Sequence, residues 1–337
     1  MSAPHMTAPH TAWGILGLGV HVPERRVSNA DIAEQYGVEP AWIERMTGIT
    51  HRHYADPAEA TSDLALAAAA DALADAGLAA GDIDVVLLAT STPDQLAVAT
   101  ACRVQHRLGA HRAWATDIGG ACAGFLNALK LARDVLTASY PQGRALVIGA
   151  ETFSKFQNPR DRSTGVLFAD GAGAVVVGPA GEGEGLLCSV QGSDGALADI
   201  VGIRAGGSAR PADARSLAEG GHYLHMNGKA VAAYFHDVFP RIVQDLTRTC
   251  GLPLDRIDLV VPHQANPRML RTLGTELGIS PEQLVITADT YGNTGAASIP
   301  MALHTARADG RLAPRTTVLH AAVGAGMSWA GVVQRWL

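Results

Sequence analysis

Two kinds of apolar segment alternate along this chain of 337 residues. Short runs of strand length, such as Ile-Asp-Val-Val-Leu-Leu-Ala-Thr at 83–90, alternate with longer segments in which apolar residues recur every three to four positions. Strands are predicted over residues 15–22, 83–90, 113–117, 144–149, 173–177, 259–262, 284–287, 316–322 and 327–336. Helices are predicted over residues 29–36, 40–46, 63–76, 125–136, 228–250, 267–277 and 297–309. This alternation predicts an α/β fold with a largely parallel, buried sheet.

The helix over 63–76 shows how single residues mark the ends of such segments. Ser62 is of the type that caps a helix, because its hydroxyl can accept a backbone N–H of the first turn. Gly77 follows the last helical residue, where a left-handed backbone ends many helices. We therefore expect the helix to begin directly after Ser62 and to end at Ala76.

A short pattern recurs about half a chain apart. Gly77-Leu78 ends one helix and Ile83-Asp84 opens the next strand, and Gly251-Leu252 and Ile257-Asp258 repeat this order at an offset of 174 residues (251 − 77 and 257 − 83). We interpret this as two halves of similar fold that meet in the glycine-rich stretch 178–185. A flexible tail at 1–11, an N-terminal half at 12–180 and a C-terminal half at 181–337 follow from it. In such a duplication equivalent strand ends face each other, and sites form outside those ends.

Composition narrows the class of protein. Hydrophobic residues make up 47% and charged residues 17%, which suits a large core, and the net charge of −6 argues against nucleic acid as a partner. No segment has the length of a membrane span and the N-terminus has no signal pattern, so we expect a soluble, cytoplasmic protein. The four cysteines show no paired spacing, so neither a disulfide framework nor a metal site is expected. Cys102, Cys188 and Cys250 are predicted to be small buried side chains.

Cys122 is the candidate nucleophile. It lies in Gly-Gly-Ala-Cys-Ala-Gly-Phe at 119–125, directly before an apolar helical pattern. A thiol in the first helical turn faces unpaired N–H groups and the positive end of the helix dipole, and both favour the reactive thiolate. A buried structural thiol is the alternative, and the small residues around Cys122, which leave room for a substrate, favour the nucleophile.

Two further segments supply a base and a hydrogen-bond donor. His263 follows a predicted strand, and Asn293 lies between Gly292 and Thr294 in a turn. Each has an ordinary explanation, since the chain has 13 histidines and asparagine is common in turns. A Cys, a His and an Asn on separate loops at strand ends are nevertheless the parts of a nucleophilic acyl-transfer site. Gly14, Gly17 and Gly19 do not form a dinucleotide loop, because their spacing is wrong and Pro23 follows where a helix is required.

Three segments carry a family resemblance: Ala-Cys-Ala-Gly-Phe at 121–125, Pro-His-Gln-Ala-Asn at 262–266 and Gly-Asn-Thr-Gly-Ala-Ala-Ser at 292–298. They are similar to the signature motifs of β-ketoacyl-acyl-carrier-protein synthase III, the chain-initiating condensing enzymes of the thiolase superfamily. Further matches at 42–43, 47–49, 161–164, 168–174 and 324–329 extend the resemblance over nearly the whole chain. The resemblance implies a thiolase-like fold, a duplicated five-layer α/β/α/β/α body with two mixed sheets, and a homodimer.

The resemblance also implies a mechanism. Cys122 would take an acyl group from acyl-coenzyme A, and the backbone amides of Cys122 and Ala325 would hold the oxyanion. His263 and Asn293 would stabilise the enolate formed when a malonyl thioester loses carbon dioxide, giving a β-ketoacyl carrier protein. Acyl-coenzyme A is expected as a substrate, and no cofactor is expected. The other residues that the resemblance assigns are Trp42, Arg162, Gly228 and Asn266 for coenzyme A, Phe125 and the partner subunit's Ala97 for the acyl pocket, and Arg268 and Arg271 for an acyl carrier protein.

The chain departs from the family pattern at three places. Met46 stands where an arginine is expected one turn after Trp42, and Ala97 stands where the partner subunit inserts an aromatic residue. Loss of that ring opens space, so a primer longer or bulkier than acetyl is predicted. Ala233, Thr275 and Glu276 occupy positions of docking lysines, which predicts a weaker encounter with an acidic carrier.

Alternative functions remain on the same fold. An acyltransferase would move the acyl group from Cys122 to a small alcohol or amine without releasing carbon dioxide. A non-catalytic subunit of a condensing heterodimer lacks the nucleophile, so the presence of Cys122 argues against it. A cysteine hydrolase would use similar residues, but the order of motifs along the chain favours condensation in fatty-acid or polyketide initiation.

Overall fold

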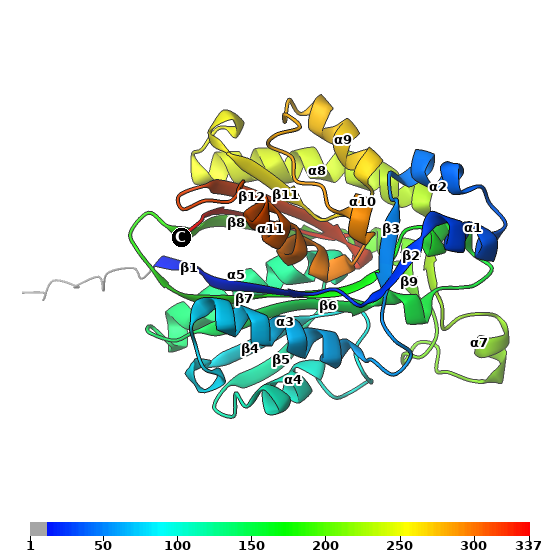
Figure 1. The fold of residues 1–337 in the computed structure, drawn as a ribbon, viewed down its shortest axis with the longest axis horizontal. Coiled ribbons are helices and arrows are strands. Elements are labelled where there is room, and N and C mark those ends of the chain that lie inside the picture. The colour runs from blue at the N-terminus through cyan, green and yellow to red at the C-terminus, as the bar shows by residue number, and fades with distance from the viewer. Residues whose placement is uncertain (1–11) are drawn as a thin grey trace, which may run out of the picture.

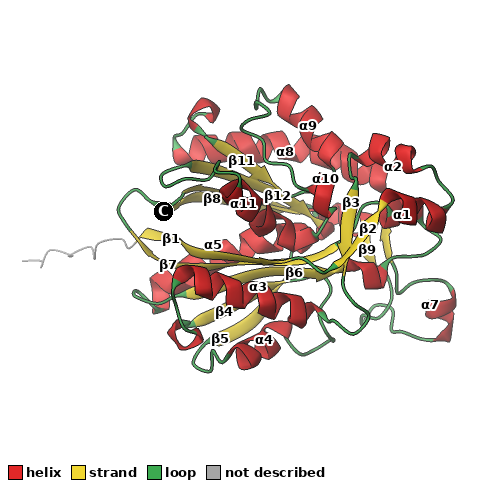
Figure 2. Cartoon of the chain, viewed as in Figure 1, coloured by secondary structure: helices red, strands yellow, loops and turns green. Residues whose placement is uncertain are grey.

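The computed structural model describes residues 12–337, so the tail expected at 1–11 lies outside the described residues. Five layers follow one another in Figure 1, helices and sheets in alternation (Figures 1 and 2). The five-layer α/β/α/β/α arrangement with two mixed sheets is therefore confirmed. The layers, from one outer face to the other, are α3 (Thr61–Ala76) with α4 (Thr100–Leu108), the first sheet, α5 (Gly124–Ser139) with α11 (Ser298–Ala308), the second sheet, and α8 (Gly228–Cys250) with α9 (Pro267–Glu276).

The two sheets have related strand orders, but the first has five strands and the second four. The first has the order β1-β7-β6-β4-β5 and the second β11-β12-β13-β8. The first sheet has two parallel pairs at one side and the second has one, and the other pairs are antiparallel, so both sheets are mixed where the hydrophobic pattern alone predicted a largely parallel one. The strands of the first sheet are β1 (Ala12–His21), β4 (Val85–Ala89), β5 (Trp114–Ile118), β6 (Ala145–Thr152) and β7 (Asp170–Ala180). Those of the second are β8 (Gly185–Ser193), β11 (Leu259–Pro262), β12 (Thr317–Gly324) and β13 (Ser328–Arg335).

The repeated sequence pattern folds in the same way twice. Gly77 and Gly251 both end their helices with a φ of 64°. Asp84 donates its N–H to the Arg144 carbonyl at 2.9 Å and accepts the Arg144 N–H at 3.0 Å. Asp258 makes the same pair of bonds with Thr317, at 2.9 and 2.7 Å. The aspartates thus align β4 with β6 and β11 with β12, which explains why the pattern recurs.

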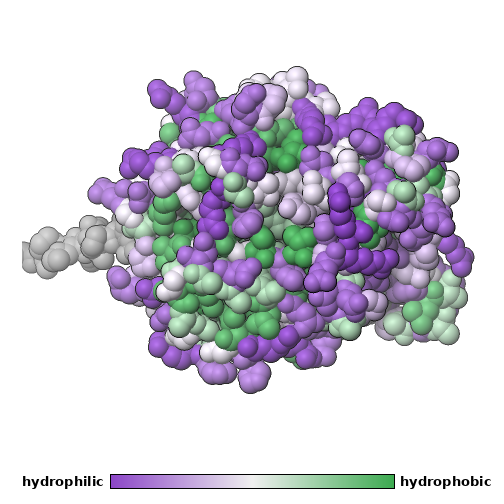
Figure 3. Space-filling view, viewed as in Figure 1, coloured by the Kyte–Doolittle hydropathy of each residue, from purple (hydrophilic) through white to green (hydrophobic). Residues whose placement is uncertain are grey.

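The core consists of three packed layers of apolar side chains. Alternate residues of β4 face opposite sides, so that Val85 and Leu87 contact the central helices while Val86 and Leu88 contact α3 and α4. A third cluster packs α8 and α9 against the outer face of the second sheet. Figure 3 shows polar residues spread over the viewed face, with smaller apolar groups between them.

Shorter elements surround one end of the sheets. They are β2 (Arg25–Ser28), β3 (His51–Tyr54), β9 (Val201–Ile203), β10 (Leu224–Met226), α1 (Asn29–Tyr36), α2 (Pro40–Thr47), α6 (Arg162–Gly165), α7 (Ala214–Ala218) and α10 (Ala288–Tyr291). The sequence pattern predicted α1 and α2 but none of the short strands. In the described part of the chain, no helix combines the length and the apolar character that crossing a membrane requires.

Two local predictions are wrong. The helix α3 begins at Thr61 rather than after Ser62, and the Asp63 carboxylate accepts the N–H of Ala60, so Ser62 is inside the helix. Residues 284–287 form a single bridge to Val260 instead of a strand. The Gln264 side chain causes this, because it bonds to the Val285 carbonyl and the Thr287 N–H and so takes the place of a neighbouring strand.

The cysteines also differ from expectation. Cys188 of β8 and Cys250 at the end of α8 form a disulfide across 62 residues. Cys102 is exposed on α4 rather than buried. The sequence signal failed because a single bridge between distant elements leaves no spacing motif.

We predict that this disulfide stabilises the fold. A closed loop of this length restrains the unfolded chain by about 4 kcal/mol in the loop-entropy description. Cys250→Ser should therefore lower the free energy of unfolding by up to about 4 kcal/mol, measured by urea denaturation without reductant. Cys102→Ser is the matched control and should leave it unchanged. Equal stability of Cys250→Ser and the native chain would contradict the prediction.

Candidate active site

Cys122 lies in a tight turn between β5 and α5. Gly120 has a φ of 111° and Ala121 a φ of 48°, a left-handed conformation that is unusual for alanine. The 3-10 turn Ala121–Ala123 then leads directly into α5. Strain of this kind at a single alanine indicates a turn that the surrounding structure holds in place.

The resting form of Cys122 differs from the sequence prediction. Burial raises the pKa of the Cys122 thiol to about 12, and the charge of Glu151 adds to the effect. The expected thiolate is therefore wrong for the unliganded protein. The largest cause is the removal of the sulfur anion from water, which opposes the effect expected of a helix start.

His263 follows β11 and is almost fully buried. Its backbone N–H donates to the Ala321 carbonyl at 2.8 Å, and its Nδ1 lies 2.8 Å from the Ser298 hydroxyl. Burial lowers the pKa of His263 to about 4, so the ring is neutral at physiological pH. Ser298 lies at Nδ1, the backbone of Gly295 also hydrogen-bonds to the ring, and the side chain lines the cavity.

Gln264 is a buried residue whose role the motif analysis missed. Its side-chain amide donates to the Pro262 and Val285 carbonyls, and its Oε1 accepts the N–H groups of Thr287 and Ala288. These four bonds tie the end of β11 to the start of α10. Because α10 leads to Asn293, Gln264 fixes the loop of the histidine relative to the loop of the asparagine.

Asn293 is held by backbone bonds on both sides. Its N–H donates to the Leu167 carbonyl and its carbonyl accepts the Ala169 N–H, both at 2.9 Å. Its Oδ1 accepts the Gly295 N–H at 3.0 Å. The side chain is thereby oriented, and Nδ2 is left as a donor with no protein partner among residues 12–337.

The end of β12 packs directly against the nucleophile turn. A Cβ atom on Gly324 would collide with the Gly120 carbonyl oxygen and would lie 2.9 Å from the Ala123 nitrogen and 3.0 Å from the Cys122 nitrogen. The turn Ala325–Met327 follows at once and lines the same cavity. The structure therefore brings the backbone of Cys122 and Ala325 to one place.

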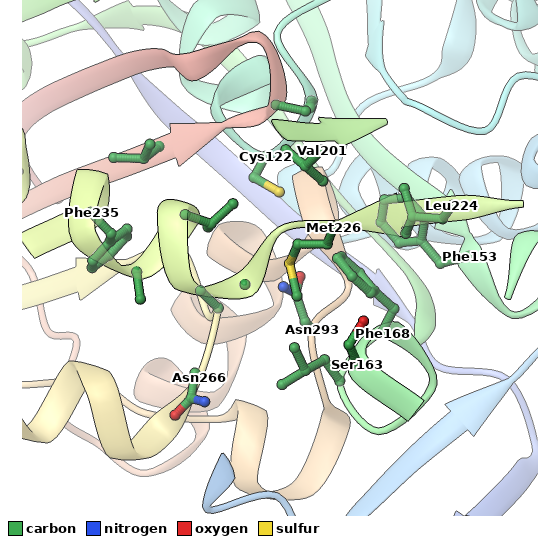
Figure 4. A pocket seen from close by; sticks show the side chains of 18 of the residues that line it. Cys122, Phe153, Ser163, Phe168, Val201, Leu224, Met226, Phe235, Asn266 and Asn293 are labelled. Carbon is green, nitrogen blue, oxygen red and sulfur yellow. The ribbon is translucent and has the colours of Figure 1, made fainter. Parts of the chain in front are cut away.

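These residues share a cavity of about 420 Å³. Cys122, His263, Asn293 and Ala325 all line it. Figure 4 shows Cys122 and Asn293 approaching from different elements, with Phe153, Phe168 and Leu224 grouped to one side. The wall is mostly apolar and includes residues of β9 and β10. In a cavity with a mostly apolar lining, the few polar groups make stronger hydrogen bonds than they would in water.

The predicted binding residues lie at the mouth of this cavity. Trp42, Arg162, Gly228 and Asn266 line it together with the exposed Met46. The Arg162 guanidinium lies 5.0 Å from the centre of the Trp42 ring, so the two side chains stack on each other. To hold an aromatic ring between them, these two side chains would have to lie about 7 Å apart, because each of the two stacking contacts takes about 3.5 Å. Asn266 also caps α9 through the Met269 N–H.

Four other predicted residues lie outside the cavity lining. Phe125 is buried in the layer of apolar side chains between the sheets, so its assignment to the acyl pocket is wrong. Ala97 lies in an exposed loop with a φ of 71° and does not line the cavity of its own chain. Arg268 bonds to the Arg45 carbonyl and Arg271 lies 3.8 Å from the Asp289 carboxylate, so both guanidinium groups have partners within the chain.

The duplicated five-layer body, with a cysteine, a histidine and an asparagine on one cavity, defines a thiolase-like enzyme that handles acyl groups. Residues 116–195 match the family described as 3-oxoacyl-[acyl-carrier-protein] synthase III, and residues 247–336 match its C-terminal part. A β-ketoacyl-[acyl-carrier-protein] synthase III of Symbiobacterium thermophilum is 44% identical over 96% of this chain and 98% of the relative.

Solved structures agree with the sequence matches. A 3-oxoacyl-(acyl-carrier-protein) synthase III superposes with a TM-score of 0.92 at 33% identity, over 96% of this chain and all of the other. The priming β-ketosynthase of the R1128 polyketide pathway superposes with a TM-score of 0.89 at 31% identity, over 99% of both chains. The chain belongs to the β-ketoacyl-acyl-carrier-protein synthase III family. The condensing function expected from the sequence, in fatty-acid or polyketide initiation, is confirmed at this level.

We predict that Gly324→Ala disables the nucleophile. The new Cβ would push β12 away from the Cys122 turn, and a displacement of about 1 Å at a reacting centre costs about 10²-fold in rate. The measurement is the rate at which Cys122 gains acyl mass from an acyl thioester. Gly81→Ala, where a Cβ meets no neighbour, is the control. An acylation rate in Gly324→Ala within about twofold of the native rate would contradict this prediction.

Proposed function

We propose that this enzyme joins an acyl primer to a malonyl thioester by decarboxylative condensation, with Cys122 as the acyl carrier. The observation that carries the proposal is the placement of Cys122, His263 and Asn293 on one cavity, each with a reactive or donor atom left for a ligand. Within residues 12–337 there is no group of three or more His, Cys, Asp or Glu side chains that could hold a metal ion.

In the first half-reaction the Cys122 sulfur attacks the carbonyl carbon of an acyl thioester. The thiol gives up its proton, the thioester C–S bond breaks, and the leaving thiolate takes up a proton. The developing oxyanion is held by the N–H groups of Cys122 and Ala325, which the contact between Gly324 and the nucleophile turn brings together.

In the second half-reaction a malonyl thioester loses carbon dioxide and becomes an enolate. His263 Nε2 and Asn293 Nδ2 donate to its thioester oxygen. The low pKa of His263 keeps the ring neutral, and we assign the Ser298 hydroxyl as the donor to Nδ1, which places the single ring proton at Nε2. The enolate carbon then attacks the acyl group, the bond to Cys122 breaks, the Cys122 thiolate takes up a proton, and a β-ketoacyl thioester leaves.

Acyl-coenzyme A is the proposed donor. The stacked Trp42 and Arg162 at the mouth would separate to admit the adenine ring, with Gly228 and Asn266 beside the pantetheine arm. The guanidinium of Arg45 has no ion-pair partner among the described residues and lines a shallow pocket with Trp42 and Arg162. It offers a positive charge one residue before Met46. The position of Met46 is the one at which the family pattern has an arginine.

We also propose a homodimer and an acyl carrier protein as partners. Strand β5 is an edge of the first sheet and carries the exposed Trp114, and the loop with Ala97 exposes Leu96 and Val98. An open edge with apolar side chains suits a second copy. Arg268 and Arg271 remain exposed on α9 although each has a partner within the chain, so they can still face an acidic carrier.

The first test is a two-step measurement of intact mass. Acyl-coenzyme A donors should add an acyl group to Cys122, and malonyl carrier protein should then remove it while the carrier gains that acyl group less carbon dioxide. Asn293→Ala should still load but should lower the second step by about 10²–10³-fold, as removal of a single oxyanion donor does. Cys122→Ser is the loading control.

An acyl-enzyme that malonyl carrier protein leaves unchanged would contradict condensation. Transfer of the acyl group to an alcohol or amine, without release of carbon dioxide, would then establish the acyltransferase alternative.

The choice of primer gives a further prediction. Because Ala97 leaves space where the family has an aromatic ring, donors longer or more branched than acetyl should load fastest. Ala97→Phe should shift the preference toward acetyl by about 10–200-fold, the range for one methylene or more in an apolar pocket. Leu96→Phe, at the neighbouring exposed position, is the matched control. Preference of the native chain for acetyl-coenzyme A over all longer donors would contradict the prediction.

A further inference from the structure

The turn Ala325–Met327 carries the amide that is proposed to hold the oxyanion, and we call it the oxyanion turn. Its backbone is left-handed at two successive residues, with a φ of 76° at Gly326 and of 48° at Met327. Glycine adopts such a φ readily, whereas a residue with a long side chain rarely does. A backbone of this kind persists only where its surroundings hold it in place. The contacts of Met327 therefore determine the shape of the turn.

Met327 is held at both its carbonyl group and its side chain. The N–H of Asp194, the residue after β8, donates to the Met327 carbonyl at 3.1 Å. The hydroxyl of Tyr234, on α8, donates to the same carbonyl at 3.1 Å. The Met327 side chain is buried in the apolar cluster that α8 and α9 form with the second sheet. Of these contacts, the Tyr234 hydroxyl is the one that a single substitution removes without changing the backbone or the core.

The residues on either side of the oxyanion turn contact the nucleophile turn. Before it, Gly324 packs so closely that a Cβ atom would lie 3.0 Å from the Cys122 nitrogen. After it, the Ser328 hydroxyl donates to the Gly120 carbonyl at 3.2 Å. The oxyanion turn thus joins two contacts with the nucleophile turn, and its own shape sets the direction of the Ala325 amide. The two bonds to the carbonyl group inside the turn fix that shape.

Tyr234 acts from outside the cavity. Val231, Ala232 and Phe235 of the same helix line the cavity, but Tyr234 does not. An acyl group bound in the cavity is therefore not in contact with the Tyr234 hydroxyl. Any effect of this hydroxyl on the reaction passes through the Met327 carbonyl that it holds.

We propose that Tyr234 is a positioning residue for the first half-reaction: its hydroxyl holds the oxyanion turn in the shape that directs the Ala325 amide at the acyl carbonyl oxygen. The proposal rests on the oxyanion role proposed for Ala325. Without the bond, Met327 is free to relax toward a commoner φ, and the amide changes direction. Because a displacement of about 1 Å at a reacting centre costs about 10²-fold in rate, loss of the bond should slow acylation by about 10–100-fold.

The test compares two reactions of Cys122 that differ in whether an oxyanion forms. Acylation, by the acyl-coenzyme A donor that loads fastest in the mass measurement, places negative charge on the carbonyl oxygen that the turn stabilises. Alkylation by iodoacetamide forms a bond from sulfur to carbon as iodide leaves, and no oxyanion develops. Both rates are measured from the mass of the peptide containing Cys122. A Cys102→Ser background removes the other free thiol.

Tyr234→Phe removes only the hydroxyl group. Its acylation rate at saturating donor should fall by about 10–100-fold, while the donor concentration at half-maximal rate and the alkylation rate stay unchanged. Tyr140→Phe, at the end of α5 remote from Cys122, is the matched control and should keep both rates. An unchanged acylation rate in Tyr234→Phe would overturn the proposal. An equal fall of acylation and alkylation would also overturn it, because it would indicate general damage to the site.

Failure of this proposal is distinguishable from failure of the proposed function. A native chain that is acylated but does not condense would contradict condensation alone. Hydrogen exchange at residues 325–328 needs no acyl donor, and it should be faster in Tyr234→Phe than in the native chain, with equal exchange in β4. Equal exchange at residues 325–328 in the two chains would overturn the proposal, whether or not either chain is acylated.

Discussion

The site depends on backbone-to-backbone contact between the two similar halves. Gly324 of the second sheet lies against the Gly120 carbonyl and the Cys122 nitrogen, and Gly149 of the first sheet lies against the Ala296 carbonyl, with no room for a Cβ at either place. Through these contacts the nucleophile turn, the end of β12 and the turn after Asn293 pack together as one block. The strained φ of Ala121 persists because this block holds it. Duplication supplies equivalent strand ends that face each other. The close glycine contacts bring the Cys122 loop of the first half against the loops of the second half, so the two halves contribute different residues to the site.

Within this block the hydrogen-bond donors are largely committed to the fold. Ser298 holds one face of His263, Gln264 ties its loop to α10, and the Gly295 N–H holds the oxygen of Asn293. The side chains proposed to act in catalysis are thus held in place and still line the cavity. Because the groups are buried and their partners fixed, little reorganisation is needed when charge develops in the transition state. The same burial raises the pKa of Cys122 and so disfavours the thiolate, which is the reactive form of the side chain.

The cavity wall comes from a part of the chain that lies outside the duplicated pattern. Residues 194–227 leave the second sheet after β8, form β9, α7 and β10, and return at the start of α8. Their side chains, with Phe153 and Phe168 of the first half, make the apolar side of the cavity. The shared core of the halves thus positions the chemistry, and this excursion shapes the space that an acyl group would fill.

The sequence by itself determined the elements whose signals are local. The helix Gly228–Cys250, the strand Leu259–Pro262 and the two capped turns at Gly77 and Gly251 follow from periodicity and from residues that favour one backbone conformation. The motifs also identified Cys122, His263 and Asn293, because small residues and strand ends surround them. Tertiary structure alone decided the bridge of Cys188 to Cys250, the raised pKa of Cys122, the bonds of Gln264 and the burial of Glu151 against the Ser91 N–H. Each of these depends on which distant segments meet and on how much water they exclude, and neither quantity is a property of neighbouring residues in the chain.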